Sequence, residues 1–143
     1  MSTLNRAVDA AASALAAERT RIEVAVSNLA NAESTRGPDG RPYRRRDVVL
    51  STDQGQSFDT ALGRASASGV KVAAIVEDES PARRRYDPSH PDADGDGYVA
   101  LPNVTPAEEM VDMVGASRAY QANLTAINLI RDMVSRALEL GKV

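Results

Sequence analysis

The pattern most suggestive of chemistry is an acidic loop at residues 92–99, with the sequence DADGDGYV. Its spacing matches a calcium-binding EF-hand loop at three ligand positions, Asp92, Asp94 and Asp96, and at the glycine that follows them. The twelfth position should be a glutamate that closes the site, but it is Asn103, and prolines rather than helices flank the loop. Because Asp and Gly are ordinary turn residues, we interpret the loop as a hairpin turn without a metal.

Two arginine triplets, Arg44–Arg46 and Arg83–Arg85, are candidates for binding an anionic partner. Alternate residues of a strand face opposite ways, so neither triplet directs all three charges at one partner. The formal net charge is −3 and no aromatic residue is interleaved within either triplet, which argues against nucleic acid as a partner. We expect solvated arginines, with salt bridges to acidic surfaces of other subunits as the alternative.

Catalytic chemistry has no support in the sequence. The chain has no cysteine, which excludes disulfides, cysteine-ligated zinc and thiol catalysis. His90 is the single histidine, and a histidine base needs a positioned nucleophile and an orienting group, neither of which is identifiable. We therefore expect a protein that is not an enzyme, with no catalytic residue, no cofactor and no small-molecule substrate.

The composition predicts a thin hydrophobic core. Of the 143 residues, 43% are hydrophobic but only 3% are aromatic, and aromatic side chains bury the most area per residue. No apolar run approaches the roughly 20 residues that span a bilayer, so we expect no membrane insertion. The N-terminal segment lacks the compact apolar stretch of a secretory signal, so no cleaved signal peptide is expected.

Two long helices are expected at the ends of the chain, over residues 1–35 and 105–143. Apolar residues recur every seven positions, the spacing of a coiled coil, at Met1, Val8, Leu15, Ile22 and Leu29, and again at Met113, Tyr120, Ile127 and Val134. Thr105 and Glu108, with Pro106 between them, predict a capping box at the start of the second helix. The pattern predicts that the helices pair as an antiparallel, coiled-coil-like hairpin.

The middle of the chain, residues 36–104, is predicted to be a small β-rich region. Its β-like runs, bounded by turn residues, are 43–51, 70–78, 83–86 and 98–101. The stretch 52–68, rich in serine and alanine, is expected to be a flexible loop. The predicted fold class is therefore α+β, with a helical axial part formed by the two ends of the chain and a β-rich middle.

A single helix pair leaves apolar surface uncovered. One pair buries one stripe on each helix, whereas the alanine-rich face of the first helix and Ile130 and Met133 on the second lie partly off that stripe. Apolar surface beyond the pair indicates further partners, either other copies or related subunits. A monomeric hairpin with its core on one side is the alternative.

The terminal segments also carry recognisable motifs. Residues 25–35, AVSNLANAEST, resemble the N-terminal signature of bacterial flagellar rod and hook proteins. Residues 102–140, which contain EMV, SRAYQAN and INLIRDM, resemble their C-terminal signature. Between them, RGPDGRPYRRRDVVL, GVKVAAIVEDESPARRRYDPSHP and DGYVALPNV are similar to the proximal rod members of this family, whose length the chain also suits.

The resemblance implies a structural subunit of the rod, the drive shaft of the flagellar basal body. Members of the family leave the cytoplasm through the flagellar type III export apparatus without signal cleavage. They then polymerise in the periplasm with copies of themselves and with neighbouring rod proteins, through their terminal helices. The alternatives are a calcium-responsive binding module that uses the loop from Asp92 to Asp96, and a different rod component of the same family.

We predict that the subunit interface lies on the two heptad faces. Its polar members are Asn28, Asn31, Gln121 and Asn123, of which the last two are expected to face away from the apolar series. Its apolar members are Leu4, Val8, Leu15, Ile22, Leu29, Met113, Tyr120, Leu124, Ile127 and Val134. Two alternatives remain open: the two asparagines of the first helix bond the backbone where that helix stops, and Tyr120 is a core residue of the hairpin.

Overall fold

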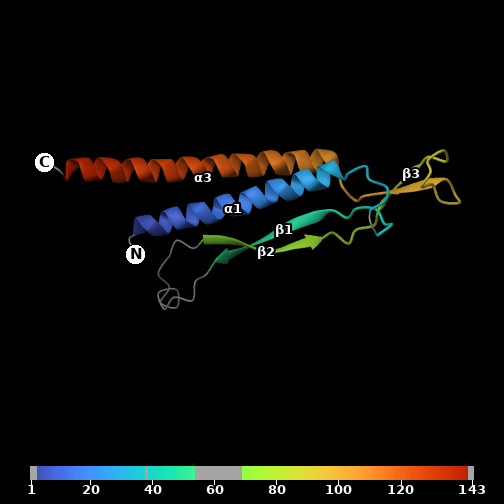
Figure 1. The fold of residues 1–143 in the computed structure, drawn as a ribbon, viewed down its shortest axis with the longest axis horizontal. Coiled ribbons are helices and arrows are strands. Elements are labelled where there is room, and N and C mark those ends of the chain that lie inside the picture. Colours follow the sequence, from blue (N-terminus) through green and yellow to red (C-terminus); the bar gives the residue numbers. More distant parts are fainter. Residues whose placement is uncertain (1–2, 38, 54–68, 142–143) are drawn as a thin grey trace.

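The computed structural model describes residues 3–37, 39–53 and 69–141, and its elements follow the predicted order (Figure 1). They are α1 (Thr3–Ala30), β1 (Arg46–Asp53), β2 (Gly69–Glu77), β3 (Arg83–Tyr86), β4 (Tyr98–Leu101) and α3 (Pro106–Leu140). Two long helices precede and follow a small region of antiparallel strands in the sequence, so the predicted α+β fold class is confirmed.

Helix α1 is the middle layer of the molecule. Figure 1 shows α3 running antiparallel along one side of α1 and the β1–β2 ribbon along the other. Helix α1 contacts α3, β1 and β2, whereas α3 contacts none of the described strands. Ala17 and Ala25 are buried in α1, and their small side chains allow neighbouring elements to approach closely. Part of the alanine-rich face that the sequence left without a partner is therefore covered by the chain's own β ribbon.

Helix α3 begins where the sequence placed it, but without the predicted side-chain cap. Thr105 has the extended backbone of an N-cap residue and Pro106 follows it, yet the Thr105 side chain makes no capping hydrogen bond. The backbone N–H groups of Glu108 and Glu109 both donate to the Thr105 carbonyl, at 3.0 and 3.2 Å. The prediction of a capping box is wrong because the N–H that the threonine hydroxyl should have accepted already has a backbone partner.

The described residues of the middle region form two separate two-stranded antiparallel sheets. In the first, β1 pairs with β2 from Arg46↔Glu77 to Asp53↔Gly69, and the register shifts between Val49 and Leu50. Thr52 and Asp53 belong to this sheet, so the first two residues of the expected loop are strand residues instead. The rest of that stretch, residues 54–68, lies outside the described residues.

The second sheet, β3 with β4, lies beyond the ends of the helices (Figure 1). Its register runs from Arg83↔Leu101 to Tyr86↔Tyr98. Val99 and Leu101 in β4 are buried, as is Val104 just before α3. The Arg83 guanidinium donates to the Pro102 carbonyl at 2.9 Å. The same guanidinium donates to the carbonyl of the buried Ala32 at 3.4 Å, so the small core of this sheet lies next to the turn that follows α1.

Candidate subunit interface

A polar cluster joins the end of α1, the start of β1 and the start of α3. Asn28, only 1% exposed, lies at its centre. The Asn28 amide donates to the Arg46 carbonyl at 2.8 Å and to the Glu109 carboxylate at 2.9 Å. Its oxygen accepts from the Arg46 N–H at 2.9 Å and from the Tyr43 hydroxyl at 3.0 Å. These four bonds use the full hydrogen-bonding capacity of an amide side chain.

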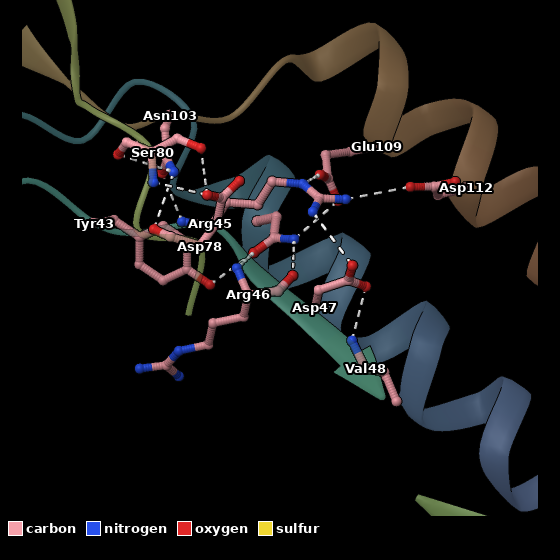
Figure 2. A network of polar contacts seen from close by, with 11 residues as sticks. Tyr43, Arg45, Arg46, Asp47, Val48, Asp78, Ser80, Asn103, Glu109 and Asp112 are labelled. Carbon is pink, nitrogen blue, oxygen red and sulfur yellow. Dashed lines mark hydrogen bonds and ion pairs between the residues drawn. The ribbon is translucent and has the colours of Figure 1, made fainter. Parts of the chain in front are cut away.

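Glu109 is the buried charge of the cluster, with 2% of its surface exposed. Figure 2 shows the Arg45 side chain reaching from the start of β1 to α3, where its Nε lies 2.6 Å from Glu109 Oε1. The same guanidinium lies 3.5 Å from Asp112 and 3.6 Å from Asp47. Burial works against the charged form of Arg45, but the hydrogen bond and charge of Glu109 outweigh it and raise the pKa of Arg45. Arg45 therefore stays charged and paired with Glu109.

Asn103 extends the cluster to the end of β2 (Figure 2). Its amide oxygen accepts from the Arg45 N–H at 2.9 Å, and its amide nitrogen donates to the Asp78 carbonyl at 3.2 Å. Ser80 donates to the Asp78 carboxylate through its hydroxyl and its N–H, and these bonds lower the pKa of Asp78. In the EF-hand comparison, Asn103 occupied the closing position; its structural role is instead to hold the segment before β1.

The predicted apolar series lies mainly along the contact between α1 and α3. Glu109 reaches Asn28 of α1 and Ala116 is buried seven residues later, so both mark the side of α3 that faces α1. Most of the predicted apolar residues are half-buried: Val8, Leu15, Ile22 and Leu29 on α1, and Met113, Tyr120 and Ile127 on α3. Three are more exposed, at 37–44% of their surface, namely Leu4, Leu124 and Val134.

Helix α3 also carries apolar side chains on the side away from α1. Val111 is 71% exposed, Leu129 is 61% and Met133 is 50%. A shallow groove in this face is lined by Met110, Val111, Val114, Gly115 and Arg118. A row of exposed apolar side chains along one helix is typical of a surface that binds another protein. We call the exposed apolar residues Val111, Val114, Leu129 and Met133 the outer face of α3.

The predicted polar interface residues fall in different places. Asn28 is fully bonded within the chain, so its contact with another subunit stays a prediction. Asn31 donates to the Ser27 carbonyl at 2.8 Å, as expected for an asparagine at a helix end. Gln121 is exposed. Asn123 was expected to face away from the apolar series, but it is half-buried and donates to the Ala119 carbonyl of its own helix at 2.9 Å.

The acidic loop is bonded to the rest of the chain. Asp92 pairs with Arg36 at 2.9 Å and accepts from the Thr35 hydroxyl at 2.8 Å. Asp94 pairs with Arg84 at 2.7 Å and accepts from the Tyr98 N–H at 2.8 Å. Within residues 3–37, 39–53 and 69–141, no three His, Cys, Asp or Glu residues are grouped so that they could hold a metal ion. These carboxylates hold the turn between β3 and β4.

Arginines of both triplets form ion pairs within the chain. Arg46 pairs with Glu77 across the first sheet at 3.2 Å. Arg85 pairs with Glu33 at 3.1 Å and joins the second sheet to the end of α1. Both side chains are still about half exposed, at 48%, so they lie on the surface as expected and in addition pair with acidic residues that are distant in sequence.

Comparison with known proteins identifies the family. A family model described as "Flagella basal body rod protein" matches residues 9–38, and one described as "Flagellar basal body rod FlgEFG protein C-terminal" matches residues 96–140. The flagellar basal-body rod protein FlgC of Salmonella typhimurium is 47% identical over 134 residues, covering 94% of this chain and 95% of that protein. FlgC of Bacillus subtilis is 45% identical over 150 residues, covering 98% and 99%. The chain belongs to the FlgC family of flagellar basal-body rod proteins.

The FlgC family relationship fits the arrangement of the polar cluster. Asn28 lies in the segment matched by the N-terminal family model, and Glu109 lies in the segment matched by the C-terminal one. The two matched segments, far apart in sequence, therefore meet in the structure at the 2.9 Å contact between these side chains. As a FlgC-family protein, the chain is a structural subunit of the flagellar basal-body rod. None of its described helices is both long enough and apolar enough to pass through a bilayer.

Proposed function

We propose that this chain is the proximal rod subunit and that it assembles with copies of itself and with neighbouring rod proteins through its terminal helices. The observation that carries the proposal is the outer face of α3, where Val111, Leu129 and Met133 are 50–71% exposed. A helix that already packs on α1 has no need of these side chains for its own hairpin. Covering them in an assembly removes apolar surface from water, which is the main driving force of most protein association.

The outer face extends the predicted interface beyond the heptad series. The half-buried residues of the heptad series hold α1 and α3 together, and we call their contact the seam. The outer face of α3 then forms one side of the resulting hairpin. The exposed members of the series, Leu4, Leu124 and Val134, border the seam and add to the surface available to a neighbour. In this assignment the helical hairpin is the assembling unit.

The route to the rod and the mechanical role follow from the family resemblance. The chain leaves the cytoplasm through the flagellar type III export apparatus, without a cleaved signal peptide, and polymerises in the periplasm. There it transmits torque along the rod, so its work is done by contacts between subunits rather than by catalysis. The low aromatic content suits this route, because a protein with a thin core has a small free energy of unfolding to overcome before export.

Mass spectrometry of purified hook–basal-body complexes tests the assignment, with complexes from a strain lacking the gene as the control. We expect the protein in the wild-type complexes, and a deletion strain that has no rods and does not swim. Absence from the complexes together with a swimming deletion strain would overturn the rod assignment.

A further inference from the structure

The apolar contact between α1 and α3 does not by itself fix how the two helices align. Its half-buried residues repeat every seven positions on both helices, so a slide of seven residues brings similar side chains together again. The fully buried apolar residues along the helices, Ala17, Ala25 and Ala116, are small and offer little shape to resist such a slide. Heptad repeats of this kind specify register poorly unless a polar residue interrupts them.

A slide of seven residues would break the contacts of the polar cluster between α1 and α3. Asn28 stands opposite Glu109 in the antiparallel pair, so a slide of seven residues in one direction places Asn28 opposite Ala116, which has no polar side-chain atom. A slide the other way places it opposite Pro102, before α3 begins. In both cases the buried Glu109 carboxylate loses Asn28 and Arg45, and one N–H of the buried Asn28 amide loses its acceptor, which costs more than the apolar mismatch.

The third partner comes from outside the helices. Arg45 supplies the charge that balances Glu109, and Arg46 supplies both backbone groups that bond Asn28. The segment that carries them is held in turn by Asn103. The cluster is therefore complete only when both helices and the start of β1 are all in place.

We propose that Asn28, Glu109 and Arg45 form a register lock, which admits one alignment of the helical hairpin and couples that alignment to the docking of β1. The lock therefore fixes how the apolar stripes of the two helices are aligned along the helix axes. It acts within a single chain and does not depend on the proposed place of the protein in the rod. Buried polar residues that fix register at some expense of stability are the best-attested use of such groups.

Pairs of introduced cysteines measure the register directly, because the chain has no cysteine of its own. Counting eleven residues from the Asn28–Glu109 contact along each helix places Ala17 opposite Tyr120. The pair Ala17→Cys with Tyr120→Cys therefore reports the native alignment. Ala17→Cys with Ile127→Cys, or with Met113→Cys, reports a slide of one heptad in either direction. Each pair is introduced into the purified full chain, which is oxidised at low concentration, and the intramolecular product is quantified on a non-reducing gel.

In the otherwise unchanged chain we expect the native product to exceed either slipped product at least tenfold. Arg45→Met removes the counter-charge of Glu109 without altering a helix, and it should lower that ratio about tenfold, the cost expected for an uncompensated buried charge. Arg84→Met is the matched control, since Arg84 pairs with Asp94 in the distant turn, and its ratio should equal that of the parent chain.

A second variant separates register from stability. Glu109→Leu combined with Arg45→Met replaces the whole ion pair by apolar side chains and leaves the Asn28–Arg46 hydrogen bonds in place, so the helices should remain paired with little change in melting temperature. We expect this variant to give native and slipped products together. A parent chain without preference for the native product would overturn the proposal. So would an unchanged ratio in both the Arg45→Met variant and the Glu109→Leu, Arg45→Met double variant.

Discussion

Asn28 and Arg46 are joined by two opposed hydrogen bonds, so that a helix side chain takes the place of a neighbouring strand. The Arg46 N–H donates to the Asn28 oxygen at 2.9 Å, and the Asn28 amide donates to the Arg46 carbonyl at 2.8 Å. The Arg45 carbonyl accepts from the Asp78 N–H on the β2 side, so the backbone groups of Arg46 point to the opposite edge. Asn28 thereby closes the free edge of β1 at its first residue.

Loss of the buried carboxylate should destabilise the fold strongly. Glu109→Ala leaves the Arg45 guanidinium and one Asn28 N–H without their partner, and we expect a loss of about 3 kcal/mol in the free energy of unfolding. Urea denaturation followed by circular dichroism measures it. Glu108→Ala is the matched control, because Glu108 is exposed on the same turn, and it should change the free energy by less than about 0.5 kcal/mol. Equal losses in the two variants would contradict the assigned role of Glu109.

Two aspartate substitutions on α3 should separate assembly from folding. Leu129→Asp lies on the outer face, where the side chain is 61% exposed, so the purified chain should keep its stability within about 0.5 kcal/mol. Its incorporation into basal bodies should fail. Ile127→Asp places a charge in the half-buried seam and should cost about 2 kcal/mol or more.

Immunoblots of export fractions and of purified basal bodies provide the measurement for both variants. Ser89→Asp, at an exposed turn position between β3 and β4, is the control and should assemble normally. Normal rods built from the Leu129→Asp variant would show that the outer face is not an interface.

Gly97 should not tolerate a side chain, whereas Gly95 two residues earlier should. Gly97 has φ +80°, and a Cβ there would lie 3.0 Å from the Tyr86 ring and 3.2 Å from Pro88. Gly97→Ala should cost about 1–2 kcal/mol, chiefly through the strained backbone, since the ring is exposed and can turn aside. A Cβ on Gly95 meets no atom within 4 Å, so Gly95→Ala should be nearly neutral. Thermal melting of the two variants gives the comparison.

The turn between β3 and β4 should loosen in acid. The Tyr98 N–H, with Arg84 as a further contributor, holds the pKa of Asp94 below its ordinary value of 3.8. A lowered folded-state pKa means that the stabilising contribution is fully present above the unfolded value and is lost as the pH falls through the folded-state value. We therefore expect the Tyr98 amide resonance to move only below about pH 4 in an NMR titration. In Asp94→Asn that transition should vanish, and its persistence would assign it to another group.

Calcium should not bind tightly to the acidic loop. A calcium ion would have to displace Arg36 from Asp92 and Arg84 from Asp94, and Asn103, which should close the site, is engaged with Arg45. Isothermal titration with calcium chloride should show no saturable heat below about 1 mM, the weak end of the EF-hand range. A micromolar Kd that Asp92→Asn abolishes would revive the calcium-responsive alternative.

Local sequence patterns predict the elements of this fold well, because their causes are local. Heptad spacing places both helices, Pro106 marks the start of α3, and alternating β-branched runs place the strands. The misses arise where a partner comes from elsewhere in the chain. The Thr105 hydroxyl has no capping role because a backbone carbonyl already accepts the N–H, and the arginines are paired because folding brings Glu77 and Glu33 beside them.

The central cluster was beyond local reasoning for the same reason. The sequence pattern marks Asn28 as an interface residue, but the buried pairing of Glu109 is not part of that prediction. Arg45 was assigned to a solvated triplet. Their contacts span 64 and 81 positions of sequence, and no local pattern encodes such a pairing. One signal is present in the sequence: Glu109 precedes Met113 of the predicted series by four residues, so both lie on the same face of the helix, where an unpaired carboxylate would be untenable.

The layered arrangement has a mechanical consequence. Among the described elements, α3 touches no strand, so a load applied to α3 reaches the β1–β2 ribbon only through α1 or through the guanidinium of Arg45. The two paths differ in stiffness: the first is a long apolar seam that yields gradually in shear, and the second is a short ionic contact of 2.6 Å that resists until it breaks. Strain in a loaded molecule would thus concentrate at the end where α1 stops and α3 starts, while the opposite end of the hairpin stays compliant.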